Sequence, residues 1–124
     1  FIDPALAALV GFLGLPVTDT EAVSLLFAGT LTIPGIVMAS IAAGFGEEVG
    51  IRGLLQPRFG IFLPALLFAS LHAFQYSWDG LVSVFLAGVA FAYIRRYSNT
   101  TTSAITHTVY DLVLFAMLMA GISF

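Results

Sequence analysis

Six ionisable residues lie within or at the ends of otherwise apolar segments: Glu47, Glu48, Arg52, His72, His107 and Asp111. Such a group is costly in apolar surroundings, so it normally faces the protein interior and marks a functional site. Glu48 precedes Arg52 by four residues, which places both on one helical face with the acid first, the better order for an ion pair. Glu47 lies about 100° around the same helix and need not share this arginine. The spacing predicts one paired and one free carboxylate.

Glu47, His72 and His107 come from three different segments and allow two chemistries if they converge. In the first, the carboxylate is a general base for water, one histidine assists it, and the other donates a hydrogen bond to a developing oxyanion. In the second, the three side chains bind Zn²⁺, which lowers the pKa of a bound water. The usual zinc signature, two histidines four residues apart with a glutamate between them, does not occur. We therefore expect no metal and no other cofactor.

Each of these residues also has a purely structural interpretation. Glu48 and Arg52 can form a buried ion pair that only holds two helices together. His107 and Asp111 are four residues apart, and either can hydrogen-bond to a neighbouring membrane helix. Phe68 lies four residues before the first histidine, and packing is its simplest role. The combination of two histidines with an unpaired glutamate favours catalysis.

The composition indicates the solvent around these residues. Of 124 residues, 60% are hydrophobic and 9% are charged, compared with about 45–50% and about 25% in soluble domains. So small a domain could not hide that much apolar surface from water. A lipid bilayer is therefore the expected partner. With four arginines and a net charge of −3, the chain lacks the positively charged surface that binding to nucleic acid requires. The lack of cysteine excludes disulfides and thiolate nucleophiles.

Charges and turn residues divide the sequence into five apolar blocks. The block at 1–17 is short and predicts a partial membrane helix or an interfacial one. The block at 22–46 is long enough to cross a bilayer, and Pro34-Gly35 should kink or split it. Further helices are expected at 61–78, 81–94 and 101–124, the last with an N-cap from the preceding loop. The sequence predicts an all-α, polytopic transmembrane helical bundle with about four to five membrane helices, one domain over 1–124, and a fragment of a longer chain, since it begins with Phe1.

The charges predict an orientation. If each block crosses the membrane once, all four arginines fall on one side and three acidic residues on the other: Asp19, Glu21 and Asp79. The positive-inside rule makes the arginine side cytoplasmic. Glu47 and Glu48 end the second block on that side. We therefore expect a multi-pass integral membrane protein whose active site lies toward the cytoplasmic face and is reached from the cytoplasm or from lipid. Three aromatic residues are interpreted as interfacial belt residues without chemistry: Tyr76, Trp78 and Tyr97.

Three stretches, in this order, resemble the signature of the CAAX protease and bacteriocin-processing family, also called the Abi family, to which the Ras-converting CAAX endopeptidase belongs. Residues 47–52, Glu-Glu-Val-Gly-Ile-Arg, resemble its first motif of two glutamates and an arginine. Residues 68–72, Phe-Ala-Ser-Leu-His, resemble its Phe-x-x-x-His motif. Residues 107–111, His-Thr-Val-Tyr-Asp, are similar to its third motif, a histidine followed four residues later by Asn or Asp. The resemblance covers about residues 44–113, the conserved core of the family.

The resemblance implies an intramembrane endopeptidase of the glutamic type that hydrolyses a peptide bond of a membrane-associated protein or peptide. By position it implies catalytic roles for Glu47 and His72 at the water and for His107 and Asp111 at the oxyanion, with support from Glu48, Arg52 and Phe68. The prenyl-protein proteases of the family usually have Asn where this sequence has Asp111. An ionised carboxylate repels an oxyanion, so Asp111 must be protonated or, as we favour, must hold His107 in its tautomer.

Two alternatives remain open. One is a zinc-dependent membrane protease that uses the same glutamate and the two histidines. The other is a non-catalytic membrane subunit or immunity protein that keeps the fold for binding. The departure at Asp111 also argues against a CAAX substrate, and many prokaryotic members that resemble this pattern are linked to peptide processing or self-immunity.

Overall fold

The chain folds into helices and connecting loops over residues 3–122, the part that the computed structural model describes. There are no strands among these residues, which confirms the predicted all-α class. In chain order the elements are α1 (Pro4–Phe12), α2 (Thr20–Phe27), the short turn η1 (Ala28–Thr30), α3 (Ile33–Glu48), the π-helical segment η2 (Val49–Leu55), α4 (Gln56–Phe59), α5 (Phe62–Ser70), α6 (Trp78–Tyr97) and α7 (Thr100–Met119).

Side chains that accept hydrogen bonds from the first free amides fix where several helices begin. Asp3 Oδ1 accepts from Ala5 N at 2.8 Å at the start of α1, and Asp19 has the same role at the start of α2. Asn99 Oδ1 accepts from Thr102 N at 2.8 Å. This contact confirms the N-cap predicted for the last helix.

The first long apolar block is split near Pro34, as its Pro-Gly pair predicted. The segment formed by α2 and η1 meets the following helix at an angle of 105°. Pro34 lies in the first turn of α3, where its missing N–H costs no helical hydrogen bond. A side chain at Gly35 would collide with the carbonyl oxygen of Thr30, so a larger residue does not fit this turn.

The helix that starts with α3 does not end at Glu48, and our expectation for this boundary was wrong. It continues through η2 and α4 as one helix from Ile33 to Phe59 and stops at Gly60, whose φ of 73° favours glycine. Charges usually end a membrane segment, but here Glu48 is paired with Arg52 inside the protein and Glu47 lines a cavity. Glu47 and Glu48 therefore lie near the middle of a long helix. The π-helical segment follows them directly, and such segments are frequent at functional sites.

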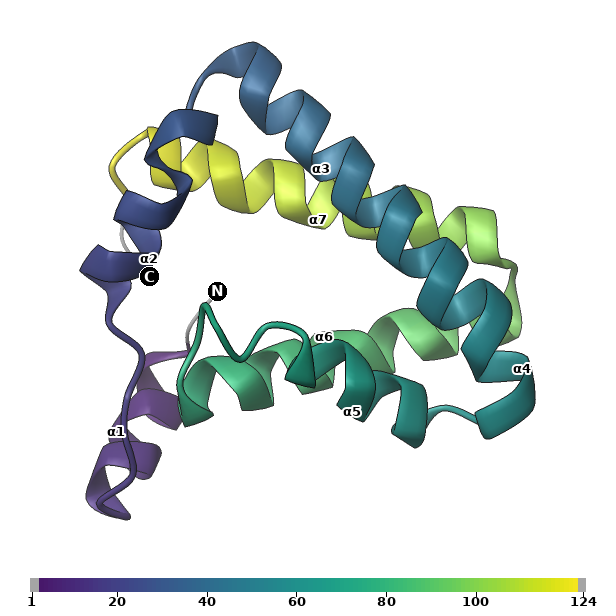
Figure 1. The fold of residues 1–124 in the computed structure, drawn as a ribbon, viewed down its shortest axis with the longest axis horizontal. Helices are drawn as coiled ribbons and strands as arrows, with labels where there is room; N and C mark the ends of the chain where they lie inside the picture. The colour runs from purple at the N-terminus through teal and green to yellow at the C-terminus, as the bar shows by residue number, and fades with distance from the viewer. Residues whose placement is uncertain (1–2, 123–124) are drawn as a thin grey trace.

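The helices form two layers that meet at one end of the molecule (Figure 1). α3 packs along α7 in one layer, and α5 packs along α6 in the other. The layers converge at the end that holds α4 and the turn between α6 and α7, and they diverge toward α1 and α2. Gly44 allows the close approach of α3 to α7, because a Cβ there would come within 2.7 Å of Thr108 N.

Two helices of the described region, α6 and α7, are long and apolar enough to cross a membrane, and the bent pair around Pro34 gives a third candidate span. This is fewer than the four to five membrane helices that we expected. The main difference is the block at 61–78, because α5 has only nine residues. Its length of about 14 Å is less than half of a hydrocarbon core of about 30 Å. Residues 71–77 form turns and a short loop instead of extending the helix.

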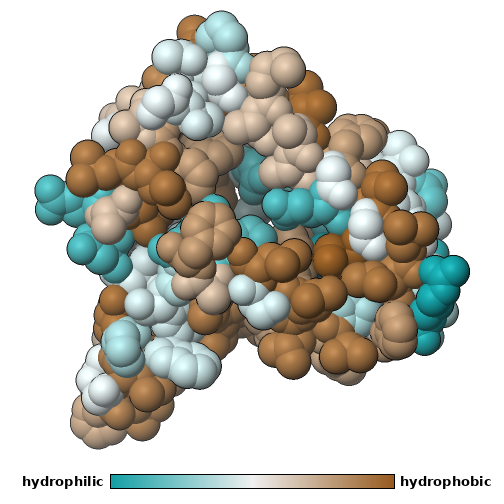
Figure 2. Space-filling view, in the orientation of Figure 1, coloured by the Kyte–Doolittle hydropathy of each residue, from teal (hydrophilic) through white to brown (hydrophobic). Residues whose placement is uncertain are grey.

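The outer surface is strongly apolar (Figure 2). Large side chains such as Phe12, Ile33, Met38 and Phe74 are mostly exposed. Exposing this much apolar surface is unfavourable in water but not among lipid tails. Polar residues gather around the central hollow in the same view (Figure 2). The chain is therefore an integral membrane protein.

Two of the charges that we counted in the topology argument are buried in the protein. Arg52 and Asp79 are both 0% exposed. Asp79 Oδ1 accepts hydrogen bonds from Thr18 N at 2.9 Å and from Thr18 Oγ1 at 2.7 Å, which ties the segment before α2 to the start of α6. The orientation inferred from the excess of arginine on one side therefore rests on three residues. They belong to α4 and to the last turn of α6, which lie at the same end of the molecule (Figure 1): Arg58, Arg95 and Arg96.

Candidate active site

Glu48 is the centre of a buried polar network that joins the first and third motifs. Its Oε1 lies 2.9 Å from Arg52 Nη1 and 3.0 Å from His107 Nδ1, which confirms the ion pair predicted from spacing. Glu48 and Arg52 are fully buried, so both depend on protein partners. Because an ionised carboxylate only accepts hydrogen bonds, Nδ1 of His107 donates its N–H to Glu48. The other ring nitrogen, Nε2, is left for other partners.

Ser103 completes this network, and the sequence analysis did not identify it. Its Oγ lies 2.7 Å from Glu48 Oε2 and 2.9 Å from the carbonyl oxygen of Phe91. A hydroxyl has one proton, so these two acceptors share it. Ser103 precedes His107 by four residues and lies on the same face of α7. This spacing was the available signal, but a serine in an apolar helix carries no charge that marks it as functional.

Arg52 is held by α6 as well as by its glutamate. Its Nη2 donates a hydrogen bond to the carbonyl oxygen of Gly88 at 2.9 Å, and its guanidinium carbon lies 4.4 Å from the centre of the Phe68 ring. A Cβ at Gly88 would come within 3.0 Å of Phe68 and 3.2 Å of Nη2, so glycine permits this close packing. Phe68 also packs edge-on against the ring of His107, with centroids 5.7 Å apart. It thus contacts residues of both other motifs.

His107 presents Nε2 to two further carboxyl groups. This nitrogen lies 3.4 Å from Asp111 Oδ2 and 4.0 Å from Glu47 Oε2. The ring stacks on Phe91 with centroids 4.6 Å apart, which fixes its plane. We expected Asp111 to hold the tautomer of His107. The structure instead gives the contact at Nδ1 to Glu48 and places Asp111 beside the other nitrogen.

Glu47 is the free carboxylate that the spacing predicted. Its side chain is 36% exposed, and its Oε2 has no hydrogen-bond partner among the described residues. One residue further along the helix, Glu48 points into the interior, whereas Glu47 lines a cavity. The two adjacent carboxylates therefore have different surroundings and can have different roles.

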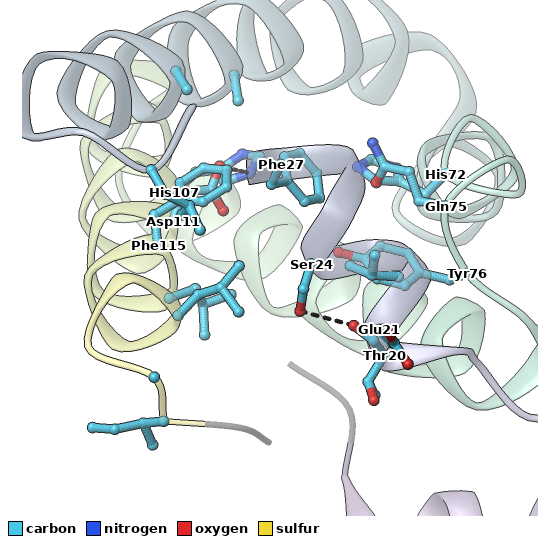
Figure 3. Close-up of a pocket in the computed structure, with 18 of the residues that line it drawn as sticks. Thr20, Glu21, Ser24, Phe27, His72, Gln75, Tyr76, His107, Asp111 and Phe115 are labelled. Carbon is cyan, nitrogen blue, oxygen red and sulfur yellow. Dashed lines mark hydrogen bonds and ion pairs between the residues drawn. The ribbon is translucent and has the colours of Figure 1, made fainter. Parts of the chain in front are cut away.

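His72 lies in the turn after α5 and lines the same cavity. Its Nδ1 is 2.8 Å from the carbonyl oxygen of Phe68. Because a carbonyl only accepts, Nδ1 carries the proton, and Nε2 of the neutral ring is an acceptor. Figure 3 shows His72 across the cavity from His107 and Asp111. The structure thus brings all four residues predicted to be catalytic to the wall of one cavity.

This cavity has a volume of about 550 Å³, which lies within the usual range for ligand sites and is large enough for several side chains of a peptide. Ser24 and Phe27 of α2 contribute to its wall, and Phe27 lies between the two histidines in Figure 3. The Phe27 ring packs against Phe115 of α7 with centroids 5.3 Å apart. The cavity therefore extends from the candidate site along α2 and the second half of α7.

Tyr76 also lines the cavity, although we had interpreted it as an interfacial residue without chemistry. It belongs to the turn after α5, outside the candidate membrane spans. Burial, with smaller effects of Asp111 and Tyr110, raises the pKa of Tyr76 to about 12. Its phenol is therefore a neutral hydrogen-bond donor at physiological pH. Its position four residues after His72 was the signal that could have placed it here.

Metal binding is the remaining chemical question at this site. Within residues 3–122, no group of three or more His, Asp or Glu side chains has an arrangement that could hold a metal ion. The expectation that the chemistry needs no metal stays a prediction, for which metal analysis is the test.

Comparisons with known proteins bear on the motifs directly. Residues 29–113, more than half of the chain, match the family described as type II CAAX prenyl endopeptidase Rce1-like. The chain is also similar to the uncharacterized protein YpbD of Bacillus subtilis (strain 168), with 28% identity over 82 residues. That match covers 66% of this chain but 43% of YpbD, so the chain spans less than half the length of this curated relative. No solved structure matches the chain. The family match confirms the resemblance inferred from the three motifs: the chain belongs to the type II CAAX prenyl endopeptidase Rce1-like family.

Proposed function

We propose that this chain carries the hydrolytic centre of a metal-independent intramembrane endopeptidase, which cleaves a peptide bond of a membrane-associated protein or peptide. One observation carries the proposal. Glu47, a carboxylate whose Oε2 has no hydrogen-bond partner in the described region, faces a peptide-sized cavity beside His107 and shares its wall with His72. Membership of a family of prenyl endopeptidases supports proteolysis as the reaction.

In the proposed reaction, Glu47 removes a proton from a water molecule while the water oxygen bonds to the carbonyl carbon of the scissile peptide. Glu47 Oε2 is a buried oxygen without a hydrogen-bond partner among the described residues, and a water bound beside it would supply the partner that it lacks. His72 offers Nε2 as an acceptor for the second proton of the same water. Holding both protons orients the oxygen lone pair toward the carbonyl carbon.

His107 is proposed to stabilise the negative oxygen of the tetrahedral intermediate. When Nε2 carries a proton it donates to this oxygen, and Glu48 at Nδ1 balances the charge of the ring. Before substrate binds, Asp111 Oδ2 lies 3.4 Å from Nε2, closer than Glu47 Oε2 at 4.0 Å. The carbon–nitrogen bond then breaks, and the proton held by Glu47 passes to the leaving amine. The net reaction is the addition of one water molecule across the peptide bond.

The side from which substrate reaches the site stays a prediction. The positive-inside rule, applied to the three arginines at the α4 end, makes that end cytoplasmic. The cavity runs from Glu47 toward α2 and the C-terminal half of α7, away from α4. Of the two routes that we expected, access from lipid fits this geometry better than access past the arginines.

Cleavage of membrane peptides by the purified protein tests the proposal. Wild type in detergent should cleave at least one member of a set of synthetic transmembrane peptides, with both new termini identified by mass spectrometry. Glu47→Gln should cleave none, while Asp19→Asn, which keeps the helix cap and lies outside the cavity lining, should keep wild-type rates. Cleavage by Glu47→Gln at the wild-type rate would refute the mechanism. Binding of peptides without any cleavage would support the non-catalytic alternative.

A further inference from the structure

Tyr76 lies beside the reacting groups, although the proposed reaction gives it no role. It lines the large cavity together with both histidines. It also lines a second, smaller cavity of about 70 Å³, the space of a few water molecules. The other residues that belong to both walls are His72, His107, Asp111 and Leu114. Tyr76 therefore borders the space between the two histidines.

A buried hydrogen-bond network, which the proposed reaction does not use, holds the backbone next to this tyrosine. Asp79 is fully buried and accepts hydrogen bonds from the amide and the hydroxyl of Thr18. Thr18 Oγ1 in turn accepts a hydrogen bond from Ser77 N at 2.9 Å, and Ser77 directly follows Tyr76. A Cβ at Gly80 would come within 2.6 Å of the Tyr76 Cβ. The position of the tyrosine is thus fixed from two sides.

The ring of Tyr76 is held against His72. Tyr76 N donates a hydrogen bond to the carbonyl oxygen of His72 at 3.1 Å, a helical bond that places both side chains on one face. The two rings are nearly parallel, with 15° between their planes and 6.4 Å between their centroids. Figure 3 shows both across the cavity from His107 and Asp111. A peptide carbonyl held between the histidines therefore lies beside Tyr76.

The negative oxygen of the proposed intermediate has one donor so far, Nε2 of His107, whereas oxyanion sites combine several donors. His72 does not supply another, because its Nδ1 proton goes to the carbonyl oxygen of Phe68 at 2.8 Å. An ionised Asp111 has no proton to donate. Burial raises the pKa of Tyr76 to about 12, so its hydroxyl keeps its proton at physiological pH. Among the polar residues common to both walls, Tyr76 is the remaining donor.

We infer that the Tyr76 hydroxyl donates a hydrogen bond to the carbonyl oxygen of the scissile peptide, and that Tyr76 and His107 together stabilise this oxygen when it becomes negative. Tyr76 keeps its proton throughout, so the proton transfers of the proposed hydrolysis are unchanged. The inference rests on the proposed function and adds a catalytic residue from outside the three motifs. It also gives the buried network of Asp79 and Thr18 a purpose, which is to fix the position of this donor.

Replacing Tyr76 with Phe separates this role from simple packing, because it removes the hydroxyl and keeps the ring beside His72. With a transmembrane peptide that wild type cleaves in detergent, kcat should fall about 100-fold, the usual effect of losing one oxyanion donor. KM should change little. Tyr110→Phe is the matched control, since it removes a tyrosine hydroxyl from the wall of the small cavity alone. It should keep kcat close to the wild-type value, and both variants should unfold near the wild-type temperature.

Binding of a phosphinic peptide tests the donor without turnover. Its phosphinate replaces the scissile bond with a tetrahedral, negatively charged group that resembles the intermediate. Tyr76→Phe should weaken binding of this peptide about 100-fold, in parallel with kcat. The affinity for the parent peptide, measured in the cleavage-deficient Glu47→Gln background, should change little, because a neutral carbonyl accepts a weaker hydrogen bond.

Gly80→Ala displaces the tyrosine without removing it. The added methyl group meets the Tyr76 Cβ, so kcat should fall in this variant as well. In the Tyr76→Phe background the same substitution should lower kcat little further, because the donor is already absent. An equal fall in both backgrounds would overturn the link between this close contact and the position of the donor.

The inference is overturned if Tyr76→Phe keeps the wild-type kcat, if Tyr110→Phe loses as much, or if the phosphinic and parent peptides lose affinity equally. Its failure is distinct from failure of the proposed function. If wild type and Tyr76→Phe cleave peptides at the same rate, proteolysis stands and the role of Tyr76 is wrong. If wild type cleaves nothing but prefers the phosphinic peptide, and Tyr76→Phe loses this preference, the oxyanion site stands and proteolysis is wrong. If wild type shows neither cleavage nor this preference, both are wrong.

Discussion

Replacing Glu48 with Gln should cost far more stability than replacing Glu47, although the two residues are adjacent. The oxygens of Glu48 lie within 3.0 Å of groups on Arg52, His107 and Ser103. Gln would leave a buried guanidinium without a counter-charge, and breaking a buried ion pair in this way costs about 3–5 kcal/mol. Glu47 is 36% exposed and lacks such a partner, so Glu47→Gln should change the free energy of unfolding by less than about 0.5 kcal/mol.

Thermal unfolding in detergent, followed by the helical circular dichroism signal, measures this difference. A loss of 3 kcal/mol in a chain of this size corresponds to a Tm lower by about 10 °C or more. Both variants should lose cleavage of membrane peptides, but for different reasons. Glu47→Gln should be folded and inactive because it lacks the base, whereas Glu48→Gln should lose activity together with stability.

The double variant Glu48→Gln/Arg52→Gln separates the charge from the packing. It removes the uncompensated guanidinium and should therefore regain part of the stability lost in Glu48→Gln. The reasoning is wrong if Glu48→Gln unfolds at the wild-type temperature, or if the double variant is no more stable than the single one. If Glu47→Gln is active while Glu48→Gln is folded but inactive, the roles that we assign to the two glutamates are reversed.

Three further predictions concern other parts of the structure. Ser103→Ala should cost about 1–3 kcal/mol and lower the cleavage rate, whereas Ser40→Ala, which removes a buried hydroxyl bonded only within its own helix, should change Tm and rate little. Single cysteines at Arg58 and Asp19 of this cysteine-free chain should react with an impermeant reagent from opposite sides of vesicles, and labelling from one side would overturn the topology. Activity should survive a chelator, and loss of activity that zinc restores would establish the zinc-dependent alternative.

Spacing along a helix was enough to predict the local part of the site. Residues four apart share a face, so the Glu48–Arg52 pair followed from sequence alone, and the same periodicity left Glu47 free. The order of the three motifs identified the family. Residue types at these spacings constrain chemistry strongly, because few arrangements stabilise charges in an apolar environment.

Contacts between helices could not be predicted in the same way. The bond from Ser103 to Glu48 depends on how deeply α7 packs against α3, and the bond from Thr18 to Asp79 depends on where the segment before α2 returns to α6. The length of α5 was missed for another reason. Hydropathy measures the preference of residues for lipid, and residues 71–77 break the helix without ending the apolar stretch.

Because of the tight contact at Gly44, catalysis also depends on a residue that has no reactive group. A methyl group there would meet the backbone of Thr108, next to His107, and would push α3 away from α7, so that Glu47 and His107 separate. In a library of all single substitutions selected for cleavage, position 44 should be as intolerant as position 47. Gly46, where an added Cβ meets no atom within 4 Å, should accept alanine. Selection for proteolysis would then act on the spacing of two helices as strongly as on the reactive side chains.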